Sequence, residues 1–276
     1  MTKKNLMIVV LVLVCALVLC GCGNKEDESA NTFTVGLECN YAPYNWTQTD
    51  DSNGAVAISD GSGYCGGYDV QIAKQIAASM NKDLVIVKTE WDGLIPAVNS
   101  GKIDAVIAGM SPTEERKTSV DFSEPYYESE LVIVVKADSE YANATSLEDF
   151  DGAKIVAQLN TFHDTVIDQI PNVQHQTAME TFPAMIVAVE SGKVDGYVSE
   201  LPGAVSAQAS NPDLTYVEFS DGEGFEASEE DVAISIAVKK GSTLLADINT
   251  ALEGISEDDR QSLMENAIVD QPVAQN

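Results

Sequence analysis

Short apolar runs alternate with amphipathic segments along most of the chain. Runs typical of buried strands occupy residues 33–37, 84–87 and 103–108, and each leads into a polar turn. Between the first two runs, Asp69 is placed as the N-cap of a helix whose apolar residues recur on one face. Strands that alternate with helices in this way predict an α/β fold.

One segment of this pattern occurs twice. Residues 95–109 (IPAVNSGKIDAVIAG) and 186–200 (IVAVESGKVDGYVSE) align without a gap, 91 residues apart, with seven identities. Each copy predicts a helix, a Ser-Gly-Lys turn and a buried strand that ends in a polar loop. This spacing is too long for a solenoid repeat and suits two similar domains. Because ligands of open α/β sheets bind beyond the carboxyl ends of strands, the loops at 109–111 and 199–200 are expected to face each other across a cleft.

The first copy leads into a predicted helix start. Ser111 is the expected N-cap, with Pro112 in the first turn and Glu114 completing a capping box. A helix N-terminus offers unpaired N–H groups and the positive end of the dipole, and Arg116 adds a bidentate donor nearby. Residues 101–127 therefore predict a carboxylate receptor. The alternative is that Arg116 is a solvated residue of a charged helix.

Two β-branched runs, 131–136 and 233–238, are expected to carry the chain between the domains. In the second domain, Thr161 follows a predicted strand at 154–157. Its hydroxyl either caps the next helix or lies near the cleft. The resulting boundaries are a first lobe at 33–134 and 233–276, and a second lobe at 135–232.

Aromatic residues gather beyond strand ends. Tyr41, Tyr44 and Trp46 fall within six residues after the first strand, and Trp91 follows the second. The first three cannot all be buried on one face, so some are expected to line the cleft. Core packing is the alternative for each of them.

The N-terminus has the pattern of an export signal. Two lysines precede an apolar run of 14 residues at 6–19, which is short for a bilayer-spanning helix. The run ends in Leu19-Cys20-Gly21-Cys22, which resembles the bacterial lipobox. The resemblance implies cleavage of residues 1–21 and lipidation of Cys22, for example with palmitate, with an uncleaved anchor as the alternative. Residues 22–32 are then a flexible tether, and the protein is held on the extracytoplasmic face of the cell membrane by its lipid alone.

The chain is strongly acidic, with a formal net charge of −29. Removing Lys3 and Lys4 with the signal leaves −31. Such a charge repels phosphate backbones and anionic lipid headgroups, which argues against nucleic acid as a partner.

The cysteines divide between export and fold. Cys15 and Cys20 leave with the signal and Cys22 carries the lipid, so Cys39 and Cys65 remain. In an exported protein such a pair most simply forms a disulfide. Two free thiols and a metal site are the alternatives, although neither histidine has metal-ligand spacing to these cysteines.

No metal or cofactor is predicted. Residues 49–60 match a calcium-binding loop only in part, because Thr49 replaces its leading acid and Asp60 its terminal Glu. The segment is interpreted as a polar surface loop.

The order of elements resembles the family 3 solute-binding proteins of bacterial polar amino-acid ABC transporters, over nearly all of residues 33–270. The specific parts are Tyr41-Ala42-Pro43-Tyr44, Gly67-Tyr68-Asp69, Glu90-Trp91-Asp92-Gly93-Leu94 and residues 101–127. The resemblance implies a type II periplasmic-binding-protein fold, with two lobes, each a β-sheet flanked by helices, joined by two crossing strands. It also implies a monomeric, non-enzymatic receptor that delivers a free amino acid to an ABC permease and its ATPase.

The resemblance implies a ligand site as well. Arg116 would bind the ligand's α-carboxylate with its bidentate guanidinium. Ser111, Thr161 and the loop residues Gly109 and Met110 would assist it. Glu200 would accept the α-ammonium, Tyr41 and Trp91 would sandwich the side chain, and Glu38, Tyr44 and Phe162 would shape the specificity pocket. Charge-assisted hydrogen bonds at the two poles contribute on the order of 1.5–3 kcal/mol each, and poles on different lobes couple binding to closure.

The chain departs from the family pattern at two positions. Asn160 stands where many members have Gly, and Asn is the next most tolerant residue of left-handed backbone. Leu201 stands where the family is often polar, so side-chain selectivity is not transferred. Glu38 hints at a polar or cationic ligand.

Two other functions compete with the receptor. Cyclohexadienyl dehydratases resemble these receptors and could use Glu200 as an acid, which requires a raised pKa and no ammonium partner. A sensor or adhesin would have to act through a partner. The sequence contains no Ser-His-Asp set, and residues 109–113 do not form a nucleophile elbow.

Overall fold

The computed structural model describes residues 31–272. The predicted signal at 1–21, the lipidation site Cys22 and most of the predicted tether lie outside the described residues. Within residues 31–272, no helix is both long enough and apolar enough to cross a membrane.

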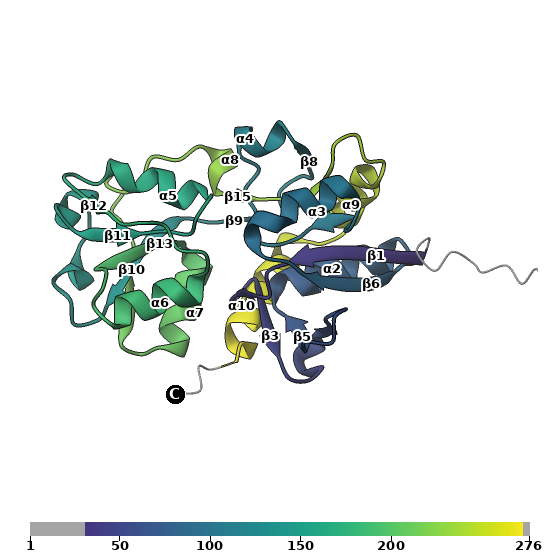
Figure 1. Ribbon diagram of the computed structural model, residues 1–276, viewed down its shortest axis with the longest axis horizontal. Coiled ribbons are helices and arrows are strands. Elements are labelled where there is room, and N and C mark those ends of the chain that lie inside the picture. The colour runs from purple at the N-terminus through teal and green to yellow at the C-terminus, as the bar shows by residue number, and fades with distance from the viewer. Residues whose placement is uncertain (1–30, 273–276) are drawn as a thin grey trace, which may run out of the picture. The chain divides into compact units, whose positions relative to one another are not determined.

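The first lobe is built on a mixed sheet (Figure 1). Its strands, in spatial order, are β6 (Asp83–Lys88), β1 (Thr32–Leu37), β7 (Ala105–Val106), β16 (Ala237–Lys239) and β8 (Val120–Phe122). β1 and β7 are parallel, whereas β16 runs antiparallel to both β7 and β8. The helices of this lobe are α2 (Tyr68–Ser79), α3 (Leu94–Ser100), α4 (Glu114–Lys117), α9 (Leu244–Glu253) and α10 (Glu257–Asp270).

A smaller antiparallel sheet lies after β1. It is formed by β2 (Asn40–Tyr41), β3 (Asn45–Gln48), β5 (Tyr64–Gly66) and β4 (Val56–Ala57), in that spatial order. The partial calcium-loop segment falls between β3 and β5 of this sheet.

The second lobe repeats the plan of the first. Its strand order is β12 (Gln174–His175), β11 (Lys154–Val156), β13 (Gly196–Glu200), β10 (Leu131–Lys136) and β14 (Leu214–Val217). β11 is parallel to β12 and β13, and β10 runs antiparallel to its two neighbours. The helices are α5 (Phe162–Val166), α6 (Phe182–Glu190), α7 (Leu201–Ser210) and α8 (Glu229–Val232).

The chain passes between the sheets at two short strands, β9 (Tyr127–Glu128) and β15 (Ala233–Ile234), which pair antiparallel. Residues 131–136 were predicted to make this crossing. In the structure they form β10, which is paired along its length with β13 and β14. β-Branched residues favour strands, and inside a sheet the backbone N–H and C=O groups of such a run are fully hydrogen-bonded. The crossing is therefore made by the short preceding strand, β9. The lobe boundaries taken from the sequence stay a prediction.

The internal repeat is visible in the hydrogen bonds as well as in the strand order. Asp104 N donates to Thr34 O at 2.8 Å, and Asp104 Oδ2 accepts from Thr34 N at 2.8 Å. Asp195 makes the same pair with Lys154, again at 2.8 Å for both bonds. We call this arrangement the strand clasp, because it fastens β7 beside β1 and β13 beside β11.

Each strand clasp is preceded by the same helix ending. Gly101 and Gly192 adopt left-handed backbone, with φ of 76° and 72°, one residue after the end of α3 and two residues after the end of α6. The following lysine N–H then reaches back to the helix, to Ala97 O in one lobe and Ala188 O in the other. This is the Gly-terminated helix end that satisfies orphan carbonyls, and it explains the repeated Ser-Gly-Lys turn.

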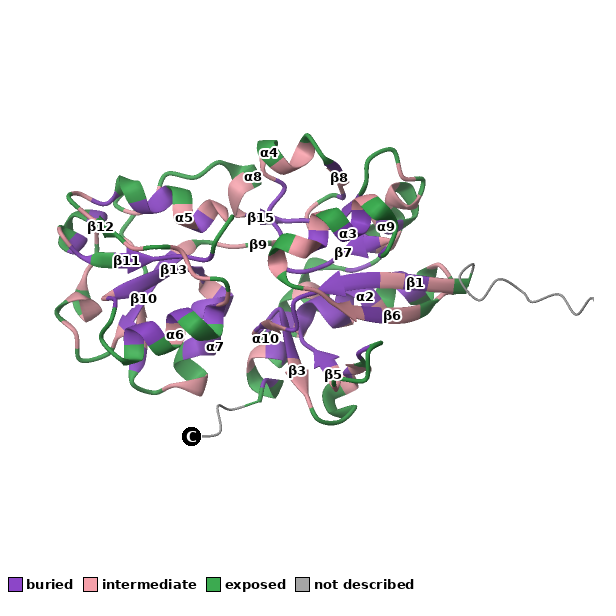
Figure 2. Cartoon of the chain, viewed as in Figure 1, coloured by how far each residue is buried: buried purple, intermediate pink, exposed green. Residues whose placement is uncertain are grey.

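The core lies against the two sheets. Figure 2 shows the strands of both sheets largely buried, while the helices keep an exposed outer side. The middle residues of β10 are all buried, as are Val35 and Leu37 of β1. Each fully buried Val, Leu or Ile contributes about 1.5–3 kcal/mol relative to an exposed one, which holds the strand ends in place for the loops that follow.

Two helix starts differ from their predictions. Ser111 is not an N-cap: α4 begins at Glu114, and the Thr113 hydroxyl caps it by accepting from Arg116 N at 3.4 Å. Thr is also a favoured N-cap residue, so the residue types alone did not decide between Ser111 and Thr113. Asp69 is not an N-cap either, because α2 begins at Tyr68 after Gly67, whose φ is 118°. An added Cβ at Gly67 would lie 2.4 Å from Tyr44 O, so this entry to the helix requires glycine.

The two remaining cysteines are buried free thiols in the structure. Cys39 precedes β2, and Cys65 lies in β5. Burial raises the pKa of the Cys65 thiol well above its ordinary value, and the adjacent Cys39 thiol raises it further. The two sulfurs are therefore neighbours, and the disulfide between them stays a prediction.

Candidate functional site

A small cavity lies between residues of the two lobes. Its volume is about 20 Å³, which is room for about one water molecule. Eight of the predicted ligand residues line it: Tyr41, Trp91, Gly109, Ser111, Arg116, Thr161, Phe162 and Glu200. Gln158, His163 and Phe182 complete the lining. The loops after β7 and β13 therefore do meet, as the repeat predicted.

Arg116 supplies the cationic side of the cavity from α4 of the first lobe. Its Nη1 donates to Ser111 O at 2.9 Å, and its Nη2 donates to Asn160 O at 3.0 Å. Its Cζ lies 4.9 Å from the ring centroid of Trp91, in a cation–π contact. Burial lowers the pKa of Arg116 to about 10, so the guanidinium stays charged at neutral pH.

Glu200 supplies the anionic side, from the last position of β13 in the second lobe. The Tyr41 hydroxyl donates to its Oε2, and the Nε2 of His163 lies 3.1 Å from its Oε1. Burial raises the pKa of Glu200 to about 8. Burial also lowers the pKa of His163 to about 4, and the charge of Arg116 acts in the same direction.

Aromatic rings form the walls between these two poles. The rings of Tyr41 and Phe182 stack with centroids 3.9 Å apart, and Trp91 lies on the guanidinium side. Gly109 is close to the first of these rings, because an added Cβ there would lie 3.0 Å from Tyr41. With φ of 61°, Gly109 also occupies the left-handed region that favours glycine.

Glu38 approaches the cavity region from the end of β1 but does not line it. Its carboxyl is buried and accepts from Gln158 Nε2 of the second lobe, at 3.1 Å to Oε1. Burial raises the pKa of Glu38 to about 7, against the lowering effect of that hydrogen bond. The two lobes are therefore bridged by an amide and a carboxyl directly beside the site.

Two other predicted ligand residues lie away from the inner cavity. Tyr44 is fully buried behind Tyr41, with the two ring centroids 4.9 Å apart. Met110 is buried, and its carbonyl accepts from Ser235 N at 2.9 Å. Their roles as ligand contacts stay predictions, and their positions suit supports of the binding loops.

The turn before α5 has the conformation that its sequence permits. Asn160 has φ of 57°, which is left-handed backbone, so the replacement of Gly at this position preserves the turn. Thr161 precedes α5, but its hydroxyl donates to Gln158 O at 2.7 Å and does not cap the helix. Asn160 Nδ2 also donates to Asp92 Oδ1 at 2.8 Å, which links this turn to the first lobe.

Buried polar groups support the loop at Gly109. Its N–H donates to the hydroxyl of Tyr126 at 3.2 Å, and that hydroxyl donates to Asp69 Oδ1 at 2.6 Å. Asp69 Oδ2 accepts from Asn45 Nδ2 at 2.8 Å. Burial raises the pKa of Asp69 to about 7 although both hydrogen bonds lower it. The loop is therefore anchored through α2 and the crossing segment.

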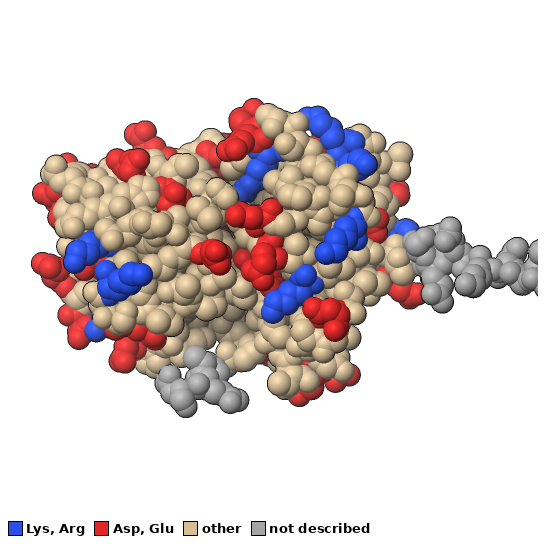
Figure 3. Space-filling model, viewed as in Figure 1, with Lys and Arg blue, Asp and Glu red and all other residues tan. Residues whose placement is uncertain are grey.

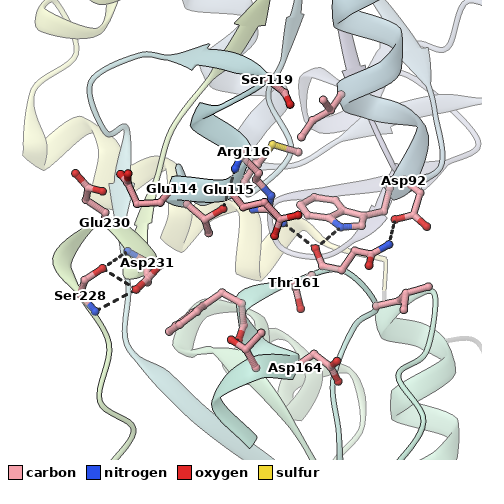
Figure 4. A pocket seen from close by; sticks show the side chains of 18 residues that line it. Asp92, Glu114, Glu115, Arg116, Ser119, Thr161, Asp164, Ser228, Glu230 and Asp231 are labelled. Carbon is pink, nitrogen blue, oxygen red and sulfur yellow. Dashed lines mark hydrogen bonds between the residues drawn. The ribbon is translucent and has the colours of Figure 1, made fainter.

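A larger opening of about 710 Å³ lies outside the small cavity and shares Trp91, Arg116, Thr161 and Phe162 with it. Figure 4 shows Arg116 and Asp92 on one side of this opening and Thr161 and Asp164 on the other. The acidic residues that line it are Asp92, Glu114, Glu115, Asp164, Glu230 and Asp231. Among the described residues that line it, Arg116 is the only base. Figure 3 shows acidic side chains near α4, with basic side chains beside them.

The described residues contain no group of three or more His, Cys, Asp or Glu side chains arranged to hold a metal ion.

Three lining residues were missed by the sequence analysis. Phe182 lies 91 residues after Trp91, which is the spacing of the internal repeat. Trp91 precedes α3 by three residues, and Phe182 is the first residue of α6, so both aromatics lie near the start of the repeated helix. That signal was present and could have identified Phe182. Gln158 and His163 flank the predicted Thr161 turn, but nothing in their spacing indicated which face they occupy.

Comparison with known proteins agrees with this geometry. The model for bacterial extracellular solute-binding proteins of family 3 matches residues 33–267. A probable histidine-binding protein of Campylobacter jejuni is 33% identical over 80% of this chain and 84% of its own length. The arginine-binding extracellular protein ArtP of Bacillus subtilis is 28% identical over 93% and 94%, respectively.

A solved structure is similar in fold as well. The amino acid ABC transporter substrate-binding protein AbpA of Streptococcus pneumoniae, bound to L-arginine, is 25% identical and superposes with a TM-score of 0.72. The match covers 88% of this chain and 96% of that one. The fold is the two-lobe, type II periplasmic-binding-protein fold that the sequence predicted. This chain belongs to the family 3 bacterial extracellular solute-binding proteins.

Proposed function

We propose that this protein is an extracytoplasmic receptor that captures a free polar or cationic amino acid between its lobes and delivers it to an ABC importer. Its relatives carry the names of histidine- and arginine-binding proteins, and AbpA holds L-arginine. The partners would be the permease and ATPase of that importer.

The observation that carries the proposal is the pairing of Arg116 and Glu200 across one cavity. A zwitterion requires a cation for its carboxylate and an acid for its ammonium. Arg116 provides a planar donor fork with Ser111 and Thr161 beside it, and Glu200 provides the acceptor. Each charge-assisted contact contributes on the order of 1.5–3 kcal/mol, so both poles together are worth several orders of magnitude in affinity.

The surroundings favour a cationic or polar side chain. Tyr41, Trp91 and Phe182 offer ring faces, on which a guanidinium or imidazole stacks favourably. The acidic lining of the outer opening raises the local concentration of cations and speeds their entry. Glu38 lies at the rear of this region as a further carboxyl.

Closure is part of the proposed mechanism. A cavity of about 20 Å³ is far smaller than an amino acid, so the lobes must separate before a ligand enters. Contacts that the ligand makes to both lobes then favour the closed arrangement, and a permease that recognises this arrangement selects loaded receptors. The short β9–β15 pair is the segment that must bend.

The dehydratase alternative has one feature in its favour, the raised pKa of Glu200. The relatives named above carry the names of amino-acid-binding proteins, and AbpA is named as a transporter's substrate-binding protein, so we retain a non-enzymatic role. Incubation with prephenate or arogenate checks this choice, because turnover contradicts it.

The proposal includes a lipid anchor at Cys22 and a disulfide between Cys39 and Cys65. Labelling cells with a fatty-acid probe is expected to mark the wild type but not Cys22→Ser, which is released to the medium. Intact-mass analysis with and without reductant is expected to differ by two hydrogens. A protein of unchanged mass would have free thiols, as the structure has.

Isothermal titration calorimetry tests the receptor with L-arginine, L-histidine, L-lysine and L-glutamine. At least one is expected to bind with a Kd of roughly 10 μM or tighter, given the two charged poles. For an arginine binder, agmatine lacks the carboxylate and N-acetylarginine lacks the ammonium, so each is expected to bind roughly 100-fold more weakly. If no amino acid binds, or if either analogue binds as tightly as the parent, the assignment of the poles is wrong.

A further inference from the structure

Glu200 is a buried carboxyl without a permanent cation beside it. Its two oxygens are contacted by the Tyr41 phenol and the His163 imidazole, and no Lys or Arg among residues 31–272 forms an ion pair with it. Arg116 lines the same cavity, but its guanidinium donates to Ser111 O and Asn160 O. A buried carboxylate with no cation is costly, so this environment favours the protonated acid.

His163 is the group best placed to exchange that proton. Its Nε2 is 3.1 Å from Glu200 Oε1, while its Nδ1 is buried and has no hydrogen-bond partner among the described residues. In most buried histidines, a partner on the second ring nitrogen fixes which nitrogen carries the hydrogen. Here the protein leaves that choice open, so both neutral tautomers are accessible.

We propose that His163 is a positioning residue for Glu200 and that capture of the ligand's ammonium releases one proton from this pair. Without ligand, the Glu200 O–H donates to Nε2 and the imidazole carries its hydrogen on Nδ1. When the ammonium arrives, the Glu200 O–H bond breaks and an Nε2–H bond forms. The Nδ1–H bond breaks and its proton goes to solvent. The carboxylate then accepts from the ammonium and from Nε2–H.

The neighbouring titratable groups are compatible with this exchange. Tyr41 of β2 donates its phenol O–H to the second oxygen of Glu200. Arg116 of α4 stays charged and disfavours a second cation on His163. The imidazole therefore passes the proton on without becoming an imidazolium. Asp164, next along α5, is engaged with His175 at 3.0 Å from Nε2.

This inference rests on the proposed function, since it needs an ammonium that binds at Glu200. Its consequence is an affinity that depends on pH. Below about pH 8, where Glu200 is protonated in the free protein, affinity is expected to rise nearly tenfold per pH unit. Above that pH the rise ends, because no proton remains to be displaced.

Calorimetry measures the proton count directly. The amino acid that binds best is titrated at pH 6.5 in phosphate and in imidazole, whose ionisation enthalpies differ. The buffer dependence of the binding heat is expected to give close to one proton released at pH 6.5, and about half a proton at pH 8. Glu200→Gln is expected to bind weakly and to release none.

Histidine variants separate a proton-exchanging role from a structural one. The chain has two histidines, so His175→Gln is the matched control and is expected to leave the proton count unchanged. His163→Gln replaces the imidazole by an amide whose N–H donor favours the ionised Glu200 before ligand arrives, and it is expected to release less than half as many protons as the wild type. In ¹⁵N NMR of the His175→Gln protein, ligand is expected to shift the hydrogen of His163 from Nδ1 to Nε2.

Two results would overturn the inference and leave the receptor intact: tight binding with no proton released, or a proton count that His163→Gln does not alter. Absence of binding by every amino acid would instead overturn the proposed function. His163→Phe serves as the second variant if His163→Gln fails to fold, and it is expected to weaken binding by roughly tenfold or more at pH 6.5.

Discussion

At the scale of single residues, Arg116 shows how a ligand group is pre-organised. Two backbone carbonyls, one from each lobe, and the Trp91 ring hold its guanidinium in place. The motif around Ser111 was sufficient to select Arg116 from the sequence. Its partner Asn160 is 44 residues away, and that contact exists only because the lobes meet. Sequence spacing therefore predicted the residue but not its environment.

Arg116→Lys is expected to weaken amino-acid binding by roughly tenfold or more, because an ammonium supplies neither the planar fork nor the stacked face. Arg116→Ala is expected to lose roughly 100-fold or more. Both are measured by calorimetry. The melting temperature of the ligand-free protein should change by only a few degrees. The neighbouring cation Lys117 is salt-bridged to Glu114 and Glu230, and Lys117→Ala serves as a control that should bind normally. A collapsed fold in Arg116→Ala would mean that the residue is structural.

At the scale of elements, the loop after β7 depends on a buried chain of hydrogen bonds. Gly109, Tyr126 and Asp69 are linked in series, and they belong to three segments far apart in the sequence. Asp69 was predicted as a helix cap because its type and position suit one. The structure uses it as an acceptor instead, because Gly67 makes the helix entry. Local propensity therefore predicted the position of α2 correctly but assigned Asp69 the wrong role.

Tyr126→Phe is expected to lower the free energy of unfolding by about 1–3 kcal/mol, because it removes the two buried hydrogen bonds of the Tyr126 hydroxyl, to the Gly109 N–H and to Asp69 Oδ1. It is also expected to weaken ligand binding several-fold, since Gly109 lines the cavity. Urea unfolding and calorimetry measure the two effects.

Tyr68→Phe is the matched control for that variant. Tyr68 is equally buried and donates to Tyr126 O at 2.8 Å, but it does not contact Gly109. It should lose comparable stability with unchanged affinity. Equal losses of affinity in the two variants would contradict a specific role for the Gly109 contact.

At the scale of the whole molecule, the fold followed from the sequence more fully than the site did. The repeat identified two similar lobes, and their strand orders are indeed equivalent. The contacts across the cleft, such as Gln158 with Glu38 and Tyr41 with Glu200, were not predicted. They join residues of different lobes, so no local pattern encodes them. Glu38 and Glu200 are buried at these contacts and have raised pKa values, a property that belongs to the assembled molecule.

The ligand-free protein is expected to melt at a higher temperature at pH 5.5 than at pH 8.5. The pKa values of Glu38, Asp69 and Glu200 are raised to about 7, 7 and 8, so the folded state binds more protons than the unfolded state. Their stabilisation is complete below the ordinary pKa and is lost as pH rises through 7 to 8. His175, whose pKa is raised by Asp164 and Asp168 despite some burial, acts in the same direction.

His163 opposes this trend, because its pKa is lowered to about 4 and its contribution is lost as pH falls below its ordinary value. The three carboxyls outweigh it, and we expect a difference of about 5 °C or more by differential scanning calorimetry. Glu200→Gln should show a shallower dependence. A melting temperature that is flat across this range, or highest at pH 8.5, would show that these carboxyls are ionised in the folded protein.

The strand clasp has a consequence for protein engineering. In both lobes, the ligand-facing loop follows the same arrangement of a helix, a glycine and an aspartate that bonds the neighbouring strand. The loops themselves differ in sequence between the two lobes. The cationic and the anionic contacts with the ligand thus come from two short loops that follow equivalent strands in the two lobes. Replacing the loops that follow the strands after Asp104 and Asp195 is a route to sensors for other small molecules that leaves the rest of the chain unchanged.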